Sequence, residues 1–322
     1  MKLPDHILRE YFICEPKDKV LTEGMTVIIP IHGKSRVKQL INSVAWATNQ
    51  TLDPVEVIIV ENGLMPLVDM DVFKQYSNVR YHFIENRGAF CKSACYNAGV
   101  SMASYQYICG LDADIIIPSE FLLYGYLELL KKDACFLADD IHFLEGEMEH
   151  MLDFNFSGKT WQNDRAKWQF HGGTFFINRQ KYYDVGGHDE YFRGYGSEDS
   201  EFYKRVHDTL SVSVSTHNIL HQEHGREPDS FVNEEKNKAY LYYVQSILLS
   251  RRIENLKQCN PHLTGKLLTK STTTITATIP TDDVRIARMN RLQAERVPRE
   301  QIKEEVAVNQ NEKRRRRILG YG

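Results

Sequence analysis

The hydrophobic positions of this chain form short continuous apolar runs that alternate with segments of helical spacing. Apolar runs at residues 25–31, 55–60 and 79–84, and a fourth run that leads into Asp112, predict buried strands. Between the first two runs, apolar residues recur on one face of an expected helix, namely Val37, Leu40, Ile41, Val44 and Ala47. A further helix is expected from about residue 91 to 102. Strands that alternate with helices predict an α/β domain with a mostly parallel sheet and right-handed crossovers.

Each of these strands is followed by a polar cluster at its carboxyl end. The clusters lie at residues 32–36, 61–63, 86–88 and 112–114. Because ligands of open α/β sheets bind outside the carboxyl ends of the strands, the clusters are expected to converge on one site. The alternative is four ordinary polar loops. No glycine-rich phosphate-binding pattern follows the first strand, which disfavours an enzyme that uses nicotinamide or ATP.

Asp112 and Asp114 are the strongest candidates for chemistry in this half of the chain. On an extended segment, residues two apart point the same way, so both carboxylates are expected to face one side. A hard divalent ion such as Mg²⁺ or Mn²⁺ would offset their repulsion. Arg36, Arg87 and Lys92 nearby would suit a metal-bound diphosphate. The alternative is a strand that ends in an ordinary Asp-containing turn.

The pattern is less regular in the second half. Residues 119–132 read as a helix with Ser119 as its N-cap, and residues 134–138 read as a strand. Residues 139–168 lack a clean period and are interpreted as loops near the site. Residues 171–179 are expected to form a strand that is entered through Gly172 and Gly173, where the backbone must approach something closely.

Two further polar groups follow. In the segment 194–201, Ser197 and the acidic residues after it predict a helix start, with Glu198 and Asp199 near the N-terminus, where the helix dipole favours their ionised forms. A capping box without catalytic meaning is the alternative. His221 and His224, three residues apart, could complete a metal site or belong to a solvated loop.

Composition narrows the class of protein. The 322 residues carry a formal net charge of −3, which argues against a protein that coats nucleic acid or an anionic membrane over its whole surface. The sequence shows neither an apolar signal core nor an apolar run of about 20 residues, so a cytoplasmic protein is expected. The six cysteines have no paired metal-ligand spacing and are expected to be reduced, buried thiols.

The order of the motifs adds a resemblance to a known family. The motifs are Val27-Ile-Ile-Pro30, Asn97-Ala-Gly99, Asp112-Ala-Asp114, Gly172-Gly173, Gly194-Tyr-Gly-Ser-Glu-Asp199 and the region of His221. In this order the chain resembles the nucleotide-sugar glycosyltransferases of the GT-A fold, a Rossmann-like α/β fold. Its first half resembles the large family-2 type. Its second half resembles the galactosyltransferase-type C-terminal module that is also found in bacterial chondroitin-polymerase-like enzymes.

The resemblance implies a domain plan. Residues 25–265 are expected to form the glycosyltransferase domain, with a nucleotide-sugar-binding half at 25–118 and an acceptor half at 119–265. Residues 1–24 would be a lead segment and residues 266–322 a charged tail.

The resemblance also implies ligand-binding roles. Asp114 would bind a Mn²⁺ or Mg²⁺ ion directly, Asp112 would lie near the metal or the ribose, and His221 matches a further metal ligand better than His224 does. Glu61 stands near the expected position of the nucleoside base, and Lys92 near that of the diphosphate of a UDP-sugar. The full set expected at the donor is Pro30, His32, Arg36, Glu61, Asn86, Lys92, Asp112, Gly172 and Gly173.

The implied catalytic residues are Asp199 and Glu198. Asp199 matches the general base and Glu198 a residue that holds the acceptor. Asp199 would take the proton of an acceptor hydroxyl as that oxygen attacks the anomeric carbon, which would invert the anomeric configuration. Tyr195 stands where a Trp is frequent in the family.

The end of the chain leaves the acceptor open. Residues 269–281 are rich in Thr, residues 282–306 are highly charged, and residues 313–317 are Lys-Arg-Arg-Arg-Arg. A solvated tail is expected, and the alternative is a basic arm for nucleic acid or for anionic lipid headgroups at a membrane surface. A saccharide acceptor is the first expectation. The alternatives are a modified base of DNA, and a non-catalytic module that only binds sugar nucleotides.

Overall fold

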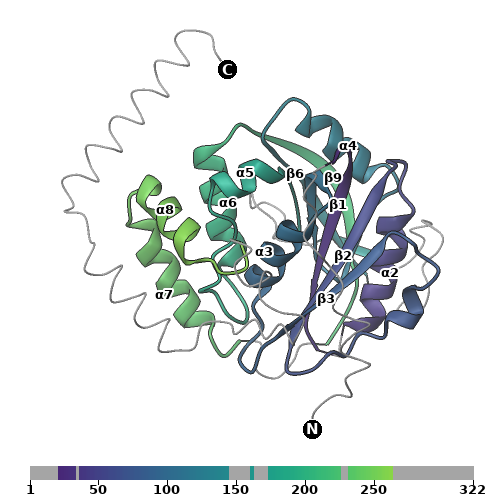
Figure 1. Ribbon diagram of the computed structural model, residues 1–322, viewed down its shortest axis with the longest axis horizontal. Helices are drawn as coiled ribbons and strands as arrows, with labels where there is room; N and C mark the ends of the chain where they lie inside the picture. The colour runs from purple at the N-terminus through teal and green to yellow at the C-terminus, as the bar shows by residue number, and fades with distance from the viewer. Residues whose placement is uncertain (1–20, 34–35, 145–159, 163–172, 226–230, 264–322) are drawn as a thin grey trace.

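A single mixed β-sheet forms the centre of the molecule (Figure 1). The structure is a computed structural model and describes residues 21–33, 36–144, 160–162, 173–225 and 231–263. The strand order is β3-β2-β1-β4-β8-β6-β9-β5, with β7 paired to β6. Residues 1–20 of the predicted lead segment 1–24 lie outside the described residues, and so does the whole predicted tail 266–322, whereas residues 21–24 begin the first strand of the sheet.

The N-terminal half of the sheet is parallel, as the sequence predicts. Its strands are β1 (Leu21–Ile31), β2 (Val55–Gly63), β3 (Val79–Glu85) and β4 (Tyr105–Leu111). β1 lies between β2 and β4 and pairs with both in parallel. Alternate residues of β1 enter two cores, because successive side chains of a strand point to opposite faces. Val27 and Ile29 pack on one face of the sheet and Ile28 packs on the other.

Antiparallel pairing enters in the second half. The strands here are β5 (Ile115–Ile116), β6 (Ala134–Leu144), β7 (Thr160–Gln162), β8 (Thr174–Asn178) and β9 (Val212–His221). β8 is antiparallel to β4 and β6, whereas β9 is parallel to β6. The predicted loop at 139–168 is therefore partly wrong. Backbone pairing of β6 with β9 continues as far as Phe143, and a hydrophobic pattern does not report such pairing.

Helices cover both faces of the sheet. Residues of α2 (Val37–Thr48) and α4 (Phe121–Leu129) belong to the core of one face. Residues of α3 (Lys92–Met102), α5 (Arg179–Asp184) and α6 (Glu198–Thr209) belong to the core of the other face. A short 3-10 helix, η1 (Met70–Phe73), precedes β3. The predicted α/β class is confirmed.

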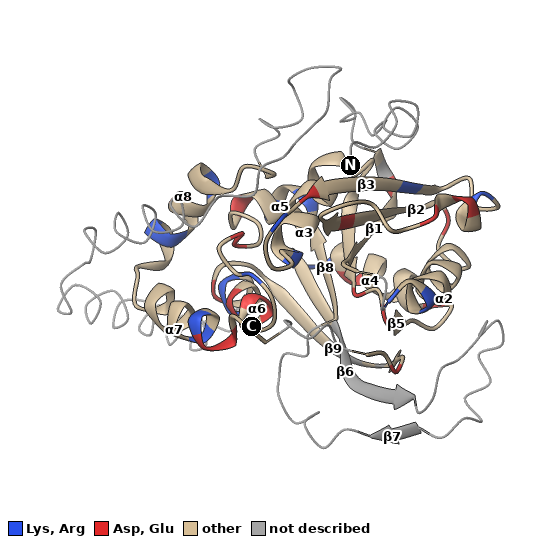
Figure 2. Cartoon of the chain, turned by 90° about the horizontal axis from the view of Figure 1, so that it is seen from below, with Lys and Arg blue, Asp and Glu red and all other residues tan. Residues whose placement is uncertain are grey.

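Two further helices lie outside the helices that cover the two faces of the sheet. α7 (Glu234–Gln245) and α8 (Leu249–Cys259) flank α6 at the end of the molecule farthest from α2, as Figures 1 and 2 both show. The residues that follow α8 return to the core at Leu263.

The expected N-caps are corrected by the structure. α4 begins at Phe121 with Glu120 as its N-cap, because Ser119 belongs to a preceding turn in which its carbonyl accepts from the Thr51 amide at 2.8 Å. Ser197 is the N-cap residue of α6, but its φ of 75° is left-handed and its side chain makes no capping hydrogen bond. The backbone of Ser197 therefore needs support from elsewhere.

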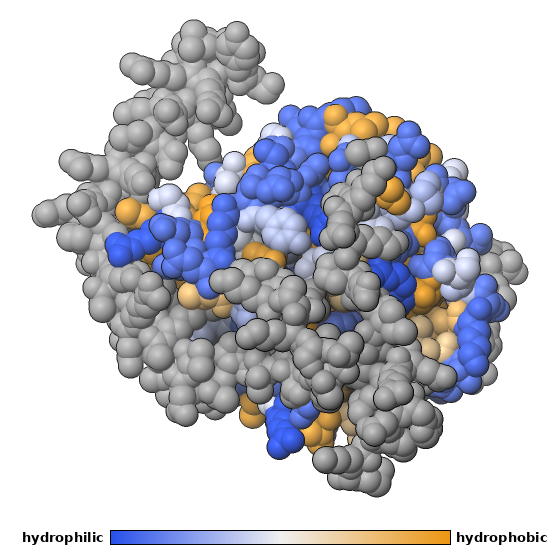
Figure 3. All heavy atoms as spheres, in the orientation of Figure 1, coloured by the Kyte–Doolittle hydropathy of each residue, from blue (hydrophilic) through white to orange (hydrophobic). Residues whose placement is uncertain are grey.

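The helices of the described residues were compared with the length and apolarity that a membrane span needs. Across the described ranges, every helix is too short or too polar to cross a bilayer. The described residues on the face in Figure 3 are mainly hydrophilic, with hydrophobic residues in separate patches.

Candidate active site

The two aspartates of the 112–114 motif lie in a turn that follows β4. The Asp112 amide donates to the Gly173 carbonyl at 2.8 Å, and the Ile115 amide donates to the Asp112 carbonyl at 3.1 Å. Because the chain turns here, the expectation that both carboxylates face one side of an extended strand is wrong. Asp112 and Asp114 reach two different sets of partners, and those sets make up the two halves of the site.

Lys92 joins Asp112 to Asp199 in the first half of the site. Its Nζ lies 2.9 Å from Oδ1 of Asp112 and 3.0 Å from Oδ2 of Asp199. The Tyr96 hydroxyl donates to Oδ1 of Asp112 at 3.0 Å. Lys92 is the first residue of α3 and Asp199 the second of α6, so helices from both halves of the chain meet here. Each carboxylate side chain keeps 22% of its surface exposed and can therefore be reached from solvent.

The ionisable groups in this half of the site shift one another's pKa values. Burial lowers the pKa of Lys92, but Asp112 and Asp199 outweigh that effect and raise the pKa well above its ordinary value. Burial, offset in part by Lys92, raises the pKa of Asp199. Burial and the neighbouring Asp199 raise the pKa of Glu198 to about 7. A protonated Lys92 therefore stands near Asp199 and Glu198, two carboxylates that are more basic than usual.

Asp114 is the centre of the second half. Its carboxylate lies 2.9 Å from Nη1 of Arg36, 3.1 Å from Nε2 of His224 and 3.8 Å from Nε2 of His221. The sheet explains this meeting, because Ile115 of β5 pairs with His221 at the end of β9. Burial raises the pKa of Asp114, but His224 and Arg36 outweigh it and hold the pKa well below its usual range. Asp114 is therefore ionised.

This half has the donors that a divalent ion needs. Ligand atoms of Asp114, His221 and His224 all lie within 4.8 Å of one another. One ionised carboxylate and two imidazoles fit a first-row ion such as Mn²⁺ better than Mg²⁺, which prefers oxygen ligands. Both histidines, and not only His221, are brought to Asp114.

A cavity of about 370 Å³ opens beside the carboxyl ends of β1 and β2. It is lined by His32, Gly33, Glu61, Gly63, Leu64, Met65 and Leu67. His32 stacks on Phe90 with the ring centroids 5.2 Å apart, and its Nδ1 lies 2.6 Å from the Asn62 carbonyl oxygen. The pocket therefore has a fixed aromatic wall.

Glu61 lies at this pocket, but its carboxylate is occupied by the protein itself. It accepts hydrogen bonds from the amides of Leu67 and Val68, at 2.8 and 3.2 Å, and from the Tyr81 hydroxyl at 2.6 Å. Burial raises the pKa of Glu61. In this structure Glu61 shapes the pocket by holding the loop that follows β2.

Four of the predicted donor residues remain, and those that the structure describes have structural contacts. Pro30 pairs with Val60 within the sheet, and Asn86 donates to the Asn62 side chain and the Ala89 carbonyl, which fixes the loop before α3. Gly173 has a φ of 112° and supplies the carbonyl that Asp112 binds. Gly172 lies outside the described residues.

Arg87, which was expected beside the acidic pair, is 82% exposed and pairs with Glu85 instead. The loop after β3 therefore contributes its positive charge to the surface rather than to the site.

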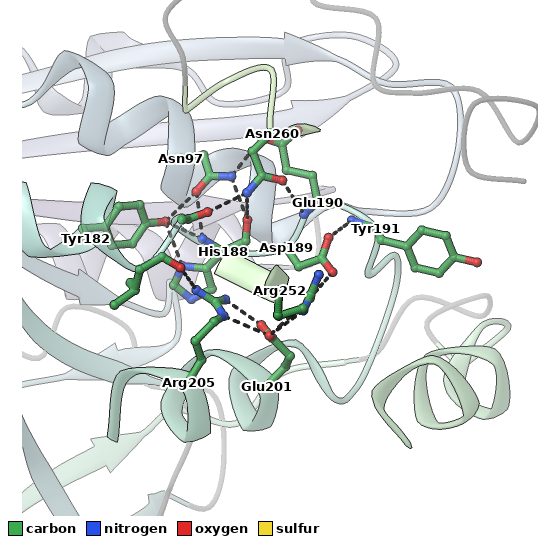
Figure 4. A network of polar contacts seen from close by, with 12 residues as sticks. Asn97, Tyr182, His188, Asp189, Glu190, Tyr191, Glu201, Arg205, Arg252 and Asn260 are labelled. Atoms are coloured by element: carbon green, nitrogen blue, oxygen red, sulfur yellow. Dashed lines mark hydrogen bonds and ion pairs between the residues drawn. The ribbon is translucent and has the colours of Figure 1, made fainter. Parts of the chain in front are cut away.

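Sequence reasoning missed the polar network under the segment 186–201 (Figure 4). Its members include Asn97, Tyr182, His188, Asp189, Glu190, Glu201, Arg205, Arg252 and Asn260. Glu201 and Arg205 form a buried ion pair four residues apart on α6. That spacing is visible in the sequence, but it is also typical of a pair on a solvated helix face, so it gave no signal of burial.

More than half of this chain matches the model of a known protein family. A family model described as glycosyl transferase family 2 matches residues 26–198. Among curated proteins, "Glycosyltransferase GlyG" of Streptococcus pneumoniae serotype 4 (strain ATCC BAA-334 / TIGR4) is 29% identical over 117 residues, which are 35% of this chain and 38% of that protein. The chain therefore spans well under half the length of that relative.

Two solved structures of Drosophila β1,4-galactosyltransferase 7 are also similar. One is the catalytic domain in complex with xylobiose, and the other is a mutant in complex with manganese, UDP-Gal and xylobiose. Both are 19% identical to this chain and cover 60% of it and 65% of their own length, with TM-scores of 0.39 and 0.36.

Proposed function

Because this chain belongs to glycosyl transferase family 2, we propose that it is a metal-dependent inverting glycosyltransferase that moves a sugar from a nucleotide donor to a hydroxyl of a saccharide. The observation that carries the proposal is the bridge from Asp112 through Lys92 to Asp199. The bridge joins the turn after β4, which is expected to hold the donor, to the carboxylate expected to act on the acceptor.

Asp199 is the proposed general base. As the acceptor oxygen attacks the anomeric carbon, Asp199 takes the hydroxyl proton, the new carbon–oxygen bond forms, and the bond from the anomeric carbon to the diphosphate oxygen breaks. A direct displacement of this kind inverts the anomeric configuration. The burial that raises the pKa of Asp199 makes it a stronger base, and neighbouring Glu198 is the proposed contact of the acceptor.

The departing diphosphate needs positive charge around it. Asp114, His221 and His224 are the proposed ligands of a Mn²⁺ ion, which would act as a Lewis acid toward the leaving group. Among the described residues, Arg36 stands beside Asp114 and Lys92 stands beside Asp112. Both are placed to pair with phosphate oxygens when the donor binds.

The cavity between His32 and Leu67 is the proposed site of the nucleoside. His32, which stacks on Phe90, gives it an aromatic wall, and Glu61 holds its loop in place. A uracil base, and hence a UDP-sugar, is the donor that the family resemblance favours. The manganese and UDP-Gal of the Drosophila mutant complex are consistent with this choice but belong to that protein.

An exposed aromatic pair, one member of which lies four residues before Asp199 in the chain, supports a saccharide acceptor. Tyr195 and Phe231 meet edge to face with centroids 5.0 Å apart, and each keeps nearly half of its surface exposed. Exposed aromatic rings offer flat apolar surfaces that suit the faces of sugar rings. The alternatives of DNA or a membrane surface rest on the basic residues 313–317, which lie outside the described residues.

Turnover with a panel of nucleotide sugars tests the proposal. Wild type, Asp114→Ala and Asp199→Asn are compared with and without Mn²⁺, with a saccharide library as acceptor. We expect transfer from a UDP-sugar that requires Mn²⁺ and is lost in both variants. Transfer that persists in EDTA, or that Asp114→Ala retains, would contradict the metal-dependent mechanism.

A further inference from the structure

The segment that leads into Asp199 has an unusual backbone. Four glycines between residues 186 and 196 have φ values of 63° to 97°, and Ser197 has a φ of 75°. For a residue with a side chain, this conformation costs on the order of 1 kcal/mol and persists only where the surroundings fix it. Ser197 directly precedes Glu198 and Asp199, so whatever fixes Ser197 also sets the position of the proposed base.

Asn237 of α7 holds the centre of this segment. Its buried side chain donates from Nδ2 to the carbonyls of Arg193 and Tyr195, at 2.9 and 3.0 Å, and its Oδ1 accepts from the Arg193 amide at 3.5 Å. These hydrogen bonds hold the backbone on both sides of Gly194. The Gly194 amide donates to the Phe90 carbonyl at 2.7 Å, two residues before Lys92.

Arg252 of α8 connects the segment to the body of α6. Its guanidinium pairs with Asp189 and with Glu201, and the side chains of all three are at least 95% buried (Figure 4). The Tyr240 hydroxyl of α7 donates to the same Asp189 carboxylate at 2.9 Å. Because Glu201 lies two residues after Asp199, this network fixes the direction in which α6 starts.

The residues after α8 close the other end of the segment. Asn260 donates to the carbonyls of Gly186 and His188, both at 2.8 Å. His262 lies 2.8 Å from the Glu190 carboxylate. Contacts from α7, from α8 and from residues 260–262 thus follow the segment from Gly186 to Tyr195.

We propose that α7, α8 and residues 260–262 form a brace that positions Asp199, with Asn237 as its main positioning residue. The family match ends at residue 198, so the brace is a feature of this chain beyond the matched region. The catalytic part of this inference rests on the proposed function. The mechanical part, that Asn237 holds residues 193–201, stands without it.

The test compares Asn237→Leu with a destabilised control. Leucine keeps the branched shape and the number of side-chain heavy atoms of Asn237, and it removes the two hydrogen bonds that Nδ2 donates and the one that Oδ1 accepts. Leu129→Ala removes buried apolar surface from α4, in the core of the opposite face of the sheet, and leaves the brace untouched. Three quantities are measured for each variant, well below its melting temperature: kcat for transfer, the Kd for UDP with Mn²⁺, and amide hydrogen exchange of residues 193–201.

We expect Asn237→Leu to lower kcat by about 10-fold to 100-fold, as a displacement of about 1 Å can do, and to leave the Kd for UDP within about two-fold. Exchange of residues 193–201 should rise in Asn237→Leu and not in Leu129→Ala. Equal losses of kcat in the two variants, or unchanged exchange in Asn237→Leu, would overturn the brace. A wild type that neither binds a nucleotide sugar nor transfers would instead overturn the proposed function, and the exchange data alone would then decide whether the brace exists.

Discussion

Lys92 is the residue on which most of the proposed chemistry converges. Its single ammonium group is shared by Asp112 on the donor side and Asp199 on the acceptor side. The shared ammonium group offsets the repulsion between the two carboxylates, which would otherwise disfavour their close approach. A diphosphate that draws Lys92 toward itself would leave Asp199 with less positive charge beside it, and therefore more basic.

The role of Asp199 can be tested by a substitution that keeps its shape. Asp199→Asn removes the proton acceptor, so kcat for transfer should fall by about two to four orders of magnitude. Binding of the donor should change little, because the substitution leaves the nucleotide pocket and the Asp114 cluster intact. Steady-state kinetics together with calorimetric titration of UDP would show both effects. Unchanged turnover would rule out Asp199 as the base.

Glu198 should make the stability of the fold depend on pH. Its pKa of about 7 lies above the ordinary value of 4.5, so between those pH values the folded state holds more protons than the unfolded state. The free energy of unfolding should therefore fall as pH rises through this window. Glu198→Gln should raise it by about 1–3 kcal/mol at pH 8 and by little at pH 5.

Urea unfolding of wild type and Glu198→Gln at the two pH values, without metal, measures this difference. A gain of equal size at pH 5 and pH 8 would mean that the Glu198 carboxylate is not the group that titrates.

Among single residues, those that stand in short polar motifs could be predicted from the sequence. Asp112, Asp114 and Asp199 could be singled out because they stand in short motifs whose order along the chain resembles that of a known family, although each carboxylate alone is also typical of a turn or a helix cap. Tyr96 and Asn237 could not be found, because each sits inside a helix and acquires its partner only through the tertiary fold.

At the scale of elements, strands buried on both faces were the easiest to predict. β1 and β2 each contain a mainly apolar run, at residues 25–31 and 55–60, and the side chains of β2 are buried along its length. β6 extends well past its apolar start and β7 is only three residues long, so backbone pairing rather than hydrophobicity defines them. The turn that separates Asp112 from Asp114 was recognised from the sequence only as the alternative to an extended strand, because its geometry depends on pairing with Gly173.

The contact of β4 with β8 leaves no room at Gly110. A Cβ atom there would lie 2.0 Å from the ring of Phe175, which is fully buried. Gly110→Ala should therefore lower the free energy of unfolding by about 1–3 kcal/mol through overpacking. Urea unfolding would measure the loss. Gly88→Ala is the matched control, since the nearest atom there is 3.5 Å away, and equal effects of the two substitutions would contradict this account of the packing.

For the whole molecule, the salt dependence of binding distinguishes an uncharged saccharide acceptor from DNA. The net charge of −3 gives no general attraction to a polyanion, and the Arg-rich residues 313–317 are a local exception. If the acceptor is an uncharged saccharide, its Kd should change by less than about two-fold between 50 and 200 mM salt. Binding to DNA through several phosphates would instead weaken by orders of magnitude over that range. Titrations at several salt concentrations would distinguish the two acceptors.

The edge of the sheet formed by β1, β2 and β4 is the proposed metal-dependent site for a nucleotide sugar. Calorimetric titration of UDP and UDP-sugars into wild type and Asp114→Ala, with Mn²⁺ and with EDTA, tests it most directly. We expect binding to wild type that requires Mn²⁺ and is lost in Asp114→Ala. Absence of binding to wild type in the presence of Mn²⁺, or equal binding by both proteins in EDTA, would contradict it.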